Sequence, residues 1–289
     1  MDANSREPYQ SRPADLPDYT NPPIDEVVIG VTFQPLGPQF GSLLSRFREL
    51  VKDRFTRTEY QPRLPPPNQT LTISNSPLPG LPLMPQPTNL GQDPFGRVWL
   101  VSEDNSNVIQ LQDDRFITNW RHAVIPYPHF NSVAGLFWDS FDQFRSESKE
   151  LGIEPFIQQV ELSYLNWIPF DEEKLYDALK STEASRVSIG DLKIDMNVQM
   201  SQTQYDVFVT GLPDARLVLT SNVGIIRISR TQSAMQRGTL LNLSFHSPVA
   251  PGATDNDIGS ILAQAREIIV RTFDSLTTET GHQVWGRFS

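Results

Sequence analysis

A block of ten prolines between Gln61 and Gly96 divides the chain and excludes regular secondary structure over that stretch. Proline fixes its own φ angle, lacks a backbone N–H and restricts the residue before it, so neither a helix nor an interior strand fits there. We therefore predict a long extended loop. Leucines such as Leu78 and Leu81 favour a connector that packs across the surface, and a polyproline ligand for an aromatic groove is the alternative.

The segments on either side of this loop follow strand and helix patterns in a regular order. β-branched runs and apolar alternation predict strands, and large apolar residues at helical spacing predict amphipathic helices. The order is strand, helix, strand, strand, helix, strand, which is the ferredoxin-like βαββαβ pattern. The predicted elements are a strand at 24–33, a helix at 37–55, a hairpin at 97–112, an extended segment at 115–122, a helix at 131–152 and a strand at 154–169.

The second part of the chain has a different pattern. After a short helix around 170–181, apolar and polar residues alternate without a break over 191–200, and further runs up to 248 continue in this style. Such alternation predicts antiparallel strands with one wet face. A long helix with one apolar stripe is predicted from about Asp255.

We therefore expect an α+β fold with a ferredoxin-like first half and, in the second half, an antiparallel sheet with a long C-terminal helix. The two halves are also compatible with one continuous sheet. The expected divisions are a flexible N-terminal tail at 1–23, a ferredoxin-like half at 24–170 with a proline-rich insertion at 61–96, and a second half at 171–289.

The net charge of -10 and the absence of cysteine limit the functions to be considered. An acidic surface repels phosphate backbones, which disfavours a nucleic-acid partner, and it is compatible with basic protein partners. A chain without cysteine forms no disulfide, no thiolate nucleophile and no cysteine-ligated metal site. The polar N-terminus does not have the pattern of a secretory signal, and no apolar run is long enough to span a membrane. We therefore expect a cytoplasmic location and no membrane partner.

The sequence contains none of the common catalytic motifs. It has no glycine-rich phosphate loop, no Gly-x-Ser-x-Gly and no His-Glu-x-x-His, and none of its four histidines lies three to five residues from another. We expect no catalytic residue, no cofactor and no metal. An enzyme of another type stays open only if the fold gathers His122, His129 and acidic groups in one cleft.

The most informative segment runs from Val108 to Phe130. If 113–121 is one strand, polar side chains share one of its faces, and Phe116 and Trp120 face the core. Such a polar row can satisfy itself through ion pairs and amide hydrogen bonds, the interpretation we favour, but arginine beside tryptophan and tyrosine also suits a pocket for an anionic or planar group. The two adjacent acids could instead mark a bend. The candidate ligand-binding or partner-binding residues are Asp113, Arg115, Asn119, Trp120, Arg121 and Tyr127.

Four segments resemble a bacterial family known only as sporadically distributed proteins of unknown function: PPIDEVVIGVTF, VIQLQDDRFITNWR, YPHF and LTTETGHQVWGRF. The resemblance spans 22–288, and its most specific part is Gln-Leu-Gln at 110–112 with Asn-Trp-Arg at 119–121, followed by Tyr-Pro at 127–128. The proline-rich stretch is less typical of that family. The resemblance implies no catalytic residues, and the patchy distribution suggests an association with toxin–antitoxin or defence modules.

These observations predict a non-enzymatic cytoplasmic interaction or regulatory protein, for instance an antitoxin-like or accessory component of a mobile bacterial module. Its partner would be a protein encoded by a neighbouring gene, and a homo-oligomer is also compatible with the sequence. The alternative is a small-molecule binding or sensing module with a pocket between helix and sheet, contacted by Arg115, Trp120, Arg121 and Tyr127.

Overall fold

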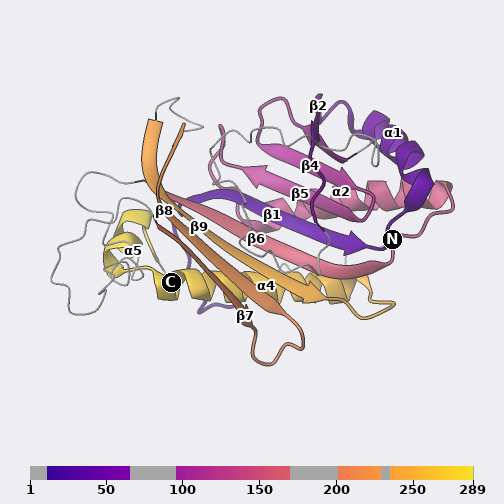
Figure 1. The fold of residues 1–289 in the computed structure, drawn as a ribbon. Helices are drawn as coiled ribbons and strands as arrows, with labels where there is room; N and C mark the ends of the chain where they lie inside the picture. The colour runs from indigo at the N-terminus through magenta and orange to yellow at the C-terminus, as the bar shows by residue number, and fades with distance from the viewer. Residues whose placement is uncertain (1–11, 66–95, 170–200, 229–234, 289) are drawn as a thin grey trace.

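A nine-stranded antiparallel sheet forms the centre of the computed structural model, which describes residues 12–65, 96–169, 201–228 and 235–288 (Figure 1). Its strand order is β2-β3-β4-β5-β1-β6-β9-β8-β7. The strands are β1 (Ile24–Phe33), β2 (Arg57–Gln61), β3 (Arg97–Val101), β4 (Asn107–Gln112), β5 (Arg115–Arg121), β6 (Ile157–Pro169), β7 (Ser201–Phe208), β8 (Arg216–Ile228) and β9 (Met235–Pro248).

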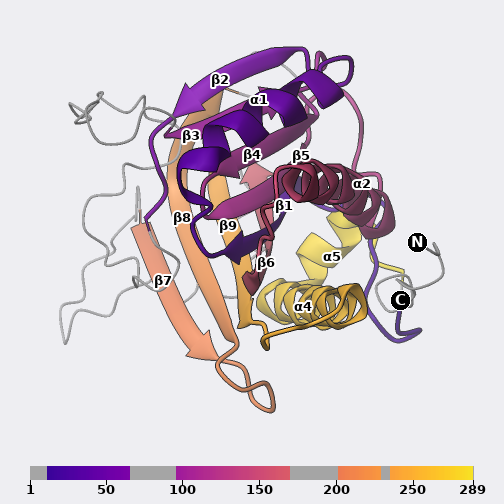
Figure 2. The same cartoon turned by 90° about the vertical axis from the view of Figure 1, so that its right-hand side faces the viewer.

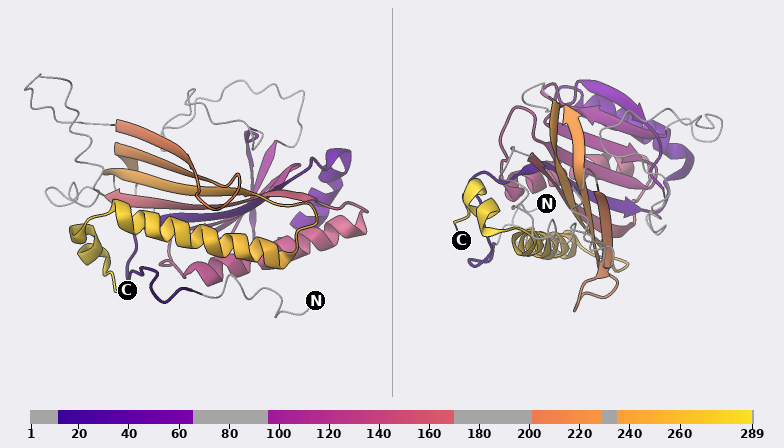
Figure 3. Two further views of the ribbon diagram at one scale, coloured as in Figure 1. Left: turned by 90° about the horizontal axis from the view of Figure 1, so that it is seen from below. Right: turned by 60° about the vertical axis from the view of Figure 1, so that its left-hand side comes forward.

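The helices cover one face of this sheet (Figure 2). α2 packs on β1 and β5, and α4 packs on β6 and β9. Seen from below, α4 runs along the sheet beside α2 (Figure 3). The helical elements are η2 (Gly37–Gln39), α1 (Phe40–Val51), α2 (Phe130–Glu150), α4 (Asp255–Leu276) and α5 (Glu279–Trp285). Over the described ranges, no helix is both long and apolar enough to cross a membrane.

The core lies between the sheet and these helices. Phe116 of β5 is fully buried at its centre, with ring centroids 5.3 Å from Phe141 and 5.1 Å from Phe144 of α2 and 6.0 Å from Phe47 of α1. The apolar stripe of α1 is buried as the helical spacing predicts, except that Leu50 is exposed. Large aromatic side chains of this kind supply most of the apolar area that a core buries.

The ferredoxin-like prediction for the first half is wrong. β1 lies between β5 and β6 and is antiparallel to both, within a sheet that continues through β9, β8 and β7. The segment predicted only as extended is a full strand, β5, and the short strand β2 forms an edge that the sequence pattern did not indicate. Because the turn at 113–114 folds β5 directly back along β4, the first half becomes a run of antiparallel neighbours.

The other local predictions have three outcomes. The helix predicted from about Asp255 is present as α4, which begins with a capping box between Thr254 and Asp257, but α5 follows it. Part of the alternating sequence predicted as strands up to 248 forms one long strand, β8. Of the extended loop predicted over 61–96, residues 66–95 lie outside the described residues, as do the short helix around 170–181 and the strand at 191–200.

A short pairing joins the segment before β1 to the end of α5. The N–H groups of Thr20 and Asn21 donate to the carbonyls of Gly286 and Trp285, both at 3.0 Å, and Phe288 donates back to Asp18 at 3.1 Å. These bonds fix residues 18–21 beside the carboxyl-terminal end of α4.

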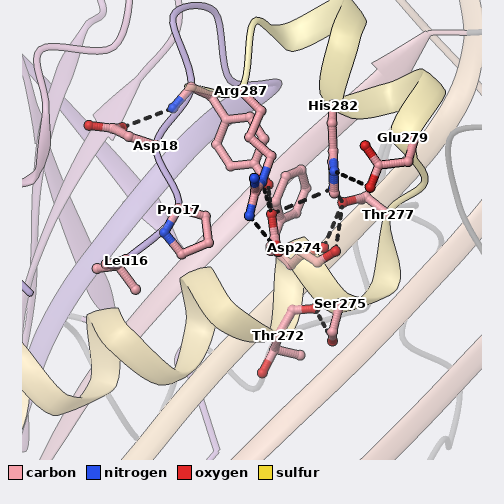
Figure 4. Close-up of polar contacts among 12 residues, drawn as sticks. Leu16, Pro17, Asp18, Thr272, Asp274, Ser275, Thr277, Glu279, His282 and Arg287 are labelled. Atoms are coloured by element: carbon pink, nitrogen blue, oxygen red, sulfur yellow. Dashed lines mark hydrogen bonds and ion pairs between the residues drawn. The ribbon is translucent and has the colours of Figure 1, made fainter. Parts of the chain in front are cut away.

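Asp274, in the last turn of α4, binds side chains from both partners of this pairing (Figure 4). Its carboxylate accepts hydrogen bonds from Tyr19 at 2.7 Å and from Arg287 at 2.6 Å. The His282 ring lies 3.6 Å away and hydrogen-bonds Thr277 at 2.8 Å. The pairing is thus reinforced by a charged cluster that is partly shielded from water.

Candidate functional site

The two adjacent acids of the sequence form the turn between β4 and β5. Asp113 pairs with Arg63, and Asp114 accepts a hydrogen bond from the Arg115 guanidinium at 2.9 Å. The two adjacent acids therefore mark a bend, which was the alternative to one strand over 113–121. The row of side chains on one face of β5 begins at Arg115 and not at Asp113.

This turn also holds the beginning of the proline block. Leu64 donates its N–H to Gln112 at 2.8 Å, and Arg115 donates to the carbonyl of Pro65 at 2.8 Å. Gln112 and Arg115 are both buried. These contacts give Arg115 a structural role in fixing residues 63–65 on the sheet.

A chain of buried hydrogen bonds crosses β4, β5 and β1 on the sheet face opposite the helices. Gln110 donates to Asn119 at 2.7 Å, and Asn119 donates to Glu26 at 2.6 Å. Arg121 donates to the same Glu26 oxygen at 3.1 Å. Buried amides and carboxylates are tolerated where they are hydrogen-bonded in this way, so the row stabilises itself.

Two arginines flank Trp99 at the β3 end of this chain. The guanidinium of Arg121 lies 4.7 Å and that of Arg97 lies 5.2 Å from the Trp99 ring, distances typical of cation–π contacts. Arg97 and Trp99 both donate to the Gln110 side-chain oxygen. Burial, and next the positive charges of Arg115 and Arg121, lower the pKa of Arg97 to about 10. This face therefore concentrates positive charge that its own carboxylates only partly balance.

A cavity of about 50 Å³ lies on the other side of the sheet, under the helices. Its walls come from the segment before β1, from β1 and β6, and from the facing ends of α2 and α4. A water molecule needs roughly 10–15 Å³ on this measure, so the cavity has room for a few waters or one small polar group. The lining residues are Arg12, Pro17, Asp18, Tyr19, Pro22, Ile24, Tyr127, His129, Phe130, Tyr164, Asn166, Arg266, Val270 and Phe273.

Two tyrosine hydroxyls meet in this cavity. The oxygens of Tyr127 and Tyr164 are 3.2 Å apart and share one hydrogen bond. Burial, and next the other tyrosine, raise the pKa of Tyr127 well above its usual range, and burial also raises the pKa of Tyr164. Both hydroxyls therefore stay protonated at neutral pH.

Arg266 of α4 and His129 at the start of α2 lie on the cavity wall. The Arg266 guanidinium lies 5.0 Å from the Phe130 ring. His129 has φ 65° and ψ 158°, a backbone conformation almost restricted to glycine, and no side chain caps the helix that follows it. Strained residues of this kind cluster at binding sites, so the strain at His129 also marks this cavity as a candidate binding site.

The structure separates the six candidate residues of the sequence into two groups. The side chains of Arg115, Asn119 and Arg121 lie on the face opposite the helices, with Asp113 at the adjoining turn, and each has the partners described above. Trp120 lies under the helices, and its ring centroid is 5.4 Å from that of Tyr127, which lines the cavity. Tyr127 therefore lines the cavity, and Trp120 packs behind it.

Sequence reasoning missed other residues of these two sites. Arg266 carries a signal in retrospect, because it lies four residues after Leu262 and four before Val270 and so interrupts the apolar side of α4. Glu26 and Tyr164 carry no such signal, since only the pairing of distant strands brings them to Arg121 and Tyr127.

Within the residues that the structure describes, no group of three or more His, Asp or Glu side chains could hold a metal ion. No protein-family model matches the chain, and no curated protein sequence matches it.

Proposed function

We propose that the protein is a non-enzymatic binding module and that the cavity between α2, α4 and the sheet is its ligand site. One observation supports this proposal above the others. The cavity brings the Arg266 guanidinium and two tyrosine hydroxyl groups together. The rest of the wall consists of apolar, aromatic and proline side chains, the ion pair of Arg12 with Asp18, and the side chains of His129 and Asn166. Sites for small molecules commonly have this composition, in which a few polar groups fix the orientation of the ligand.

The protonation of the tyrosines disfavours a role for either as a general base or a nucleophile. A tyrosine abstracts a proton or attacks a substrate only through its ionised oxygen, and the raised pKa values of Tyr127 and Tyr164 keep that form rare at neutral pH. Protonated hydroxyls are instead suited to donate hydrogen bonds.

A thermal-shift screen of small metabolites on the wild-type protein and on a cavity-filling variant tests the proposal. Val270→Phe places a larger side chain on the cavity wall, whereas Val284→Phe adds the same volume at an exposed position on α5. We expect at least one compound to stabilise the wild type and the Val284→Phe variant but not Val270→Phe. A compound set that stabilises all three proteins equally would show that binding takes place elsewhere.

A second candidate function is that of an interaction or regulatory protein, and the edge strand β7 favours it. Tyr205, Val207 and Phe208 are 58%, 48% and 71% exposed on this last strand of the described sheet. An exposed edge with large apolar side chains is suited to pair with another chain. A protein partner encoded nearby, a cytoplasmic location and an antitoxin-like or accessory role belong to this proposal.

Affinity purification at native expression level tests the second candidate. A stoichiometric partner that is lost in Val207→Lys and retained in Arg121→Ala would support an interface at β7. Recovery of the wild-type protein alone under gentle conditions would count against it.

A further inference from the structure

We propose that the group bound in the cavity is an oxyanion, a carboxylate or phosphoryl group, and that Arg266 is its main partner. This inference rests on the proposed function and specifies the chemical class of its ligand. It follows from the charges on the cavity wall, from the hydrogen-bond donors that remain there and from the size of the space.

Among the charged side chains that line the cavity, one cation has no ion-pair partner within the described chain. Arg12 and Asp18 form an ion pair at 3.4 Å, and Arg12 also donates to the carbonyls of Leu16 and Pro17 at 2.6 and 2.8 Å. Within the described chain, Arg266 has neither a hydrogen bond nor an ion pair, and its guanidinium lies 5.0 Å from the Phe130 ring. Arginine stays protonated in proteins, and a half-buried charge without a partner is costly, so an anion at this position would be stabilised.

The tyrosine pair and the start of α2 add further groups that favour an anion. The hydrogen bond between Tyr127 and Tyr164 uses one hydroxyl hydrogen, which leaves the other available to a third group. The 21-residue helix α2 begins at the cavity wall, where His129 and Phe130 line the space, with no acidic residue in its first turn and no side-chain cap at His129. The partial positive charge at that end adds to the preference for an anion.

An oxyanion fits these donors better than the other small ligands do. A cation would be repelled by Arg266, and a neutral apolar group would leave the guanidinium and the hydroxyl hydrogen unpaired. A carboxylate or phosphoryl group matches the planar fork of arginine and accepts several hydrogen bonds at once. The volume of about 50 Å³ suits such a group and not the whole of a large ligand.

Ligand-observed and arginine-side-chain NMR with acetate, acetamide and inorganic phosphate tests the inference. Acetate and acetamide have nearly the same shape and differ in charge, while phosphate represents the other source of an oxyanion. We expect acetate or phosphate to bind and to shift the Nε–Hε signal of Arg266, which is assigned by its absence in Arg266→Lys. Acetamide should bind at least about tenfold more weakly, because hydrogen bonds to charged groups are the stronger ones.

Variants then assign the binding to the cavity. Arg266→Gln should weaken binding of the anion by about tenfold or more, Arg266→Lys should retain part of it, and Tyr127→Phe should weaken it less than Arg266→Gln. The control is Arg48→Gln, which changes an exposed arginine of α1 that does not line the cavity. Circular dichroism of each variant identifies any that fails to fold, in which case Arg266→Lys and Tyr127→Phe still report on the site.

The outcomes separate this inference from the function on which it rests. Equal binding of acetamide and acetate would overturn the inference that the ligand is an oxyanion, but not the proposal that the cavity binds small molecules. Unchanged binding of the anion in Arg266→Gln, or no binding of either anion, would also overturn the inference. The screen with Val270→Phe judges the proposed function independently of these results.

Discussion

Removing the charge of Glu26 should destabilise the protein far more than breaking an ion pair at its surface. Glu26 is 7% exposed and is the shared acceptor for Asn119 and Arg121, whose side chain is 17% exposed. Glu26→Gln keeps the shape but leaves the Arg121 guanidinium without its carboxylate. Breaking a buried ion pair costs about 3–5 kcal/mol, and the partial exposure of Arg121 lowers our expectation to about 2–4 kcal/mol.

Urea unfolding followed by tryptophan fluorescence measures this loss as a shift in midpoint at constant slope. The matched control is Glu147→Gln, which breaks the pair between Glu147 and the 46% exposed Arg46 and should cost about 1 kcal/mol or less. A double-mutant cycle of Glu26→Gln with Arg121→Met isolates the coupling between the two side chains. A loss for Glu26→Gln no larger than that of the control would refute the view that this row holds the sheet together.

Three further predictions concern the backbone and the charged cluster. His129→Gly should be more stable than His129→Ala by about 1 kcal/mol or more in chemical denaturation, which reverses the usual order. The reason is that glycine adopts this backbone conformation without strain, whereas alanine does not. Equal stabilities of the two variants would contradict the strain. Gly238→Ala should destabilise, since a Cβ there would lie 2.5 Å from the Ile168 carbonyl, whereas Gly135→Ala in α2 meets open space and should raise the free energy of unfolding by about 1 kcal/mol. Burial alone would raise the pKa of Asp274, but its hydrogen bonds outweigh burial and lower the pKa below 3.8. The stability that Asp274 contributes is therefore present above pH 3.8 and is lost as the pH falls through the pKa of the folded state. The unfolding curves of the wild type and of Asp274→Asn should accordingly differ at pH 7 and converge in acid.

The sequence pattern predicted individual elements better than their arrangement. Local alternation was enough to place Phe116 in the core and Arg115, Asn119 and Arg121 on the opposite face, because the period of a strand fixes which side chains share a face. It did not show which strand lies beside which. The neighbours of β1 depend on pairings between residues far apart in the chain, such as Val28 with Asn119 and with Ser163.

The candidate site shows the same limit. Tyr127 could be chosen from its own surroundings, as an aromatic residue beside arginine and tryptophan. Tyr164 and Arg266 could not be assigned to it, because β6 and α4 reach the cavity only through the fold. The strain at His129 is equally invisible in the sequence, since histidine gives no sign of a positive φ angle.

The pairing of residues 18–21 with residues 285–288 links the cavity to the carboxyl-terminal end of the described chain. Pro17, Asp18, Tyr19 and Pro22 form part of the cavity wall, and the pairing with residues 285–288, which do not line the cavity, helps to hold them there. A deletion from Trp285 onward should therefore lower the affinity of the cavity for its ligand, although the deleted residues do not contact that ligand. The effect must be reciprocal: a ligand that binds more tightly when residues 18–21 are paired with residues 285–288 also stabilises that pairing. A protease that cleaves near Arg287 should consequently act more slowly on the liganded protein than on the free one.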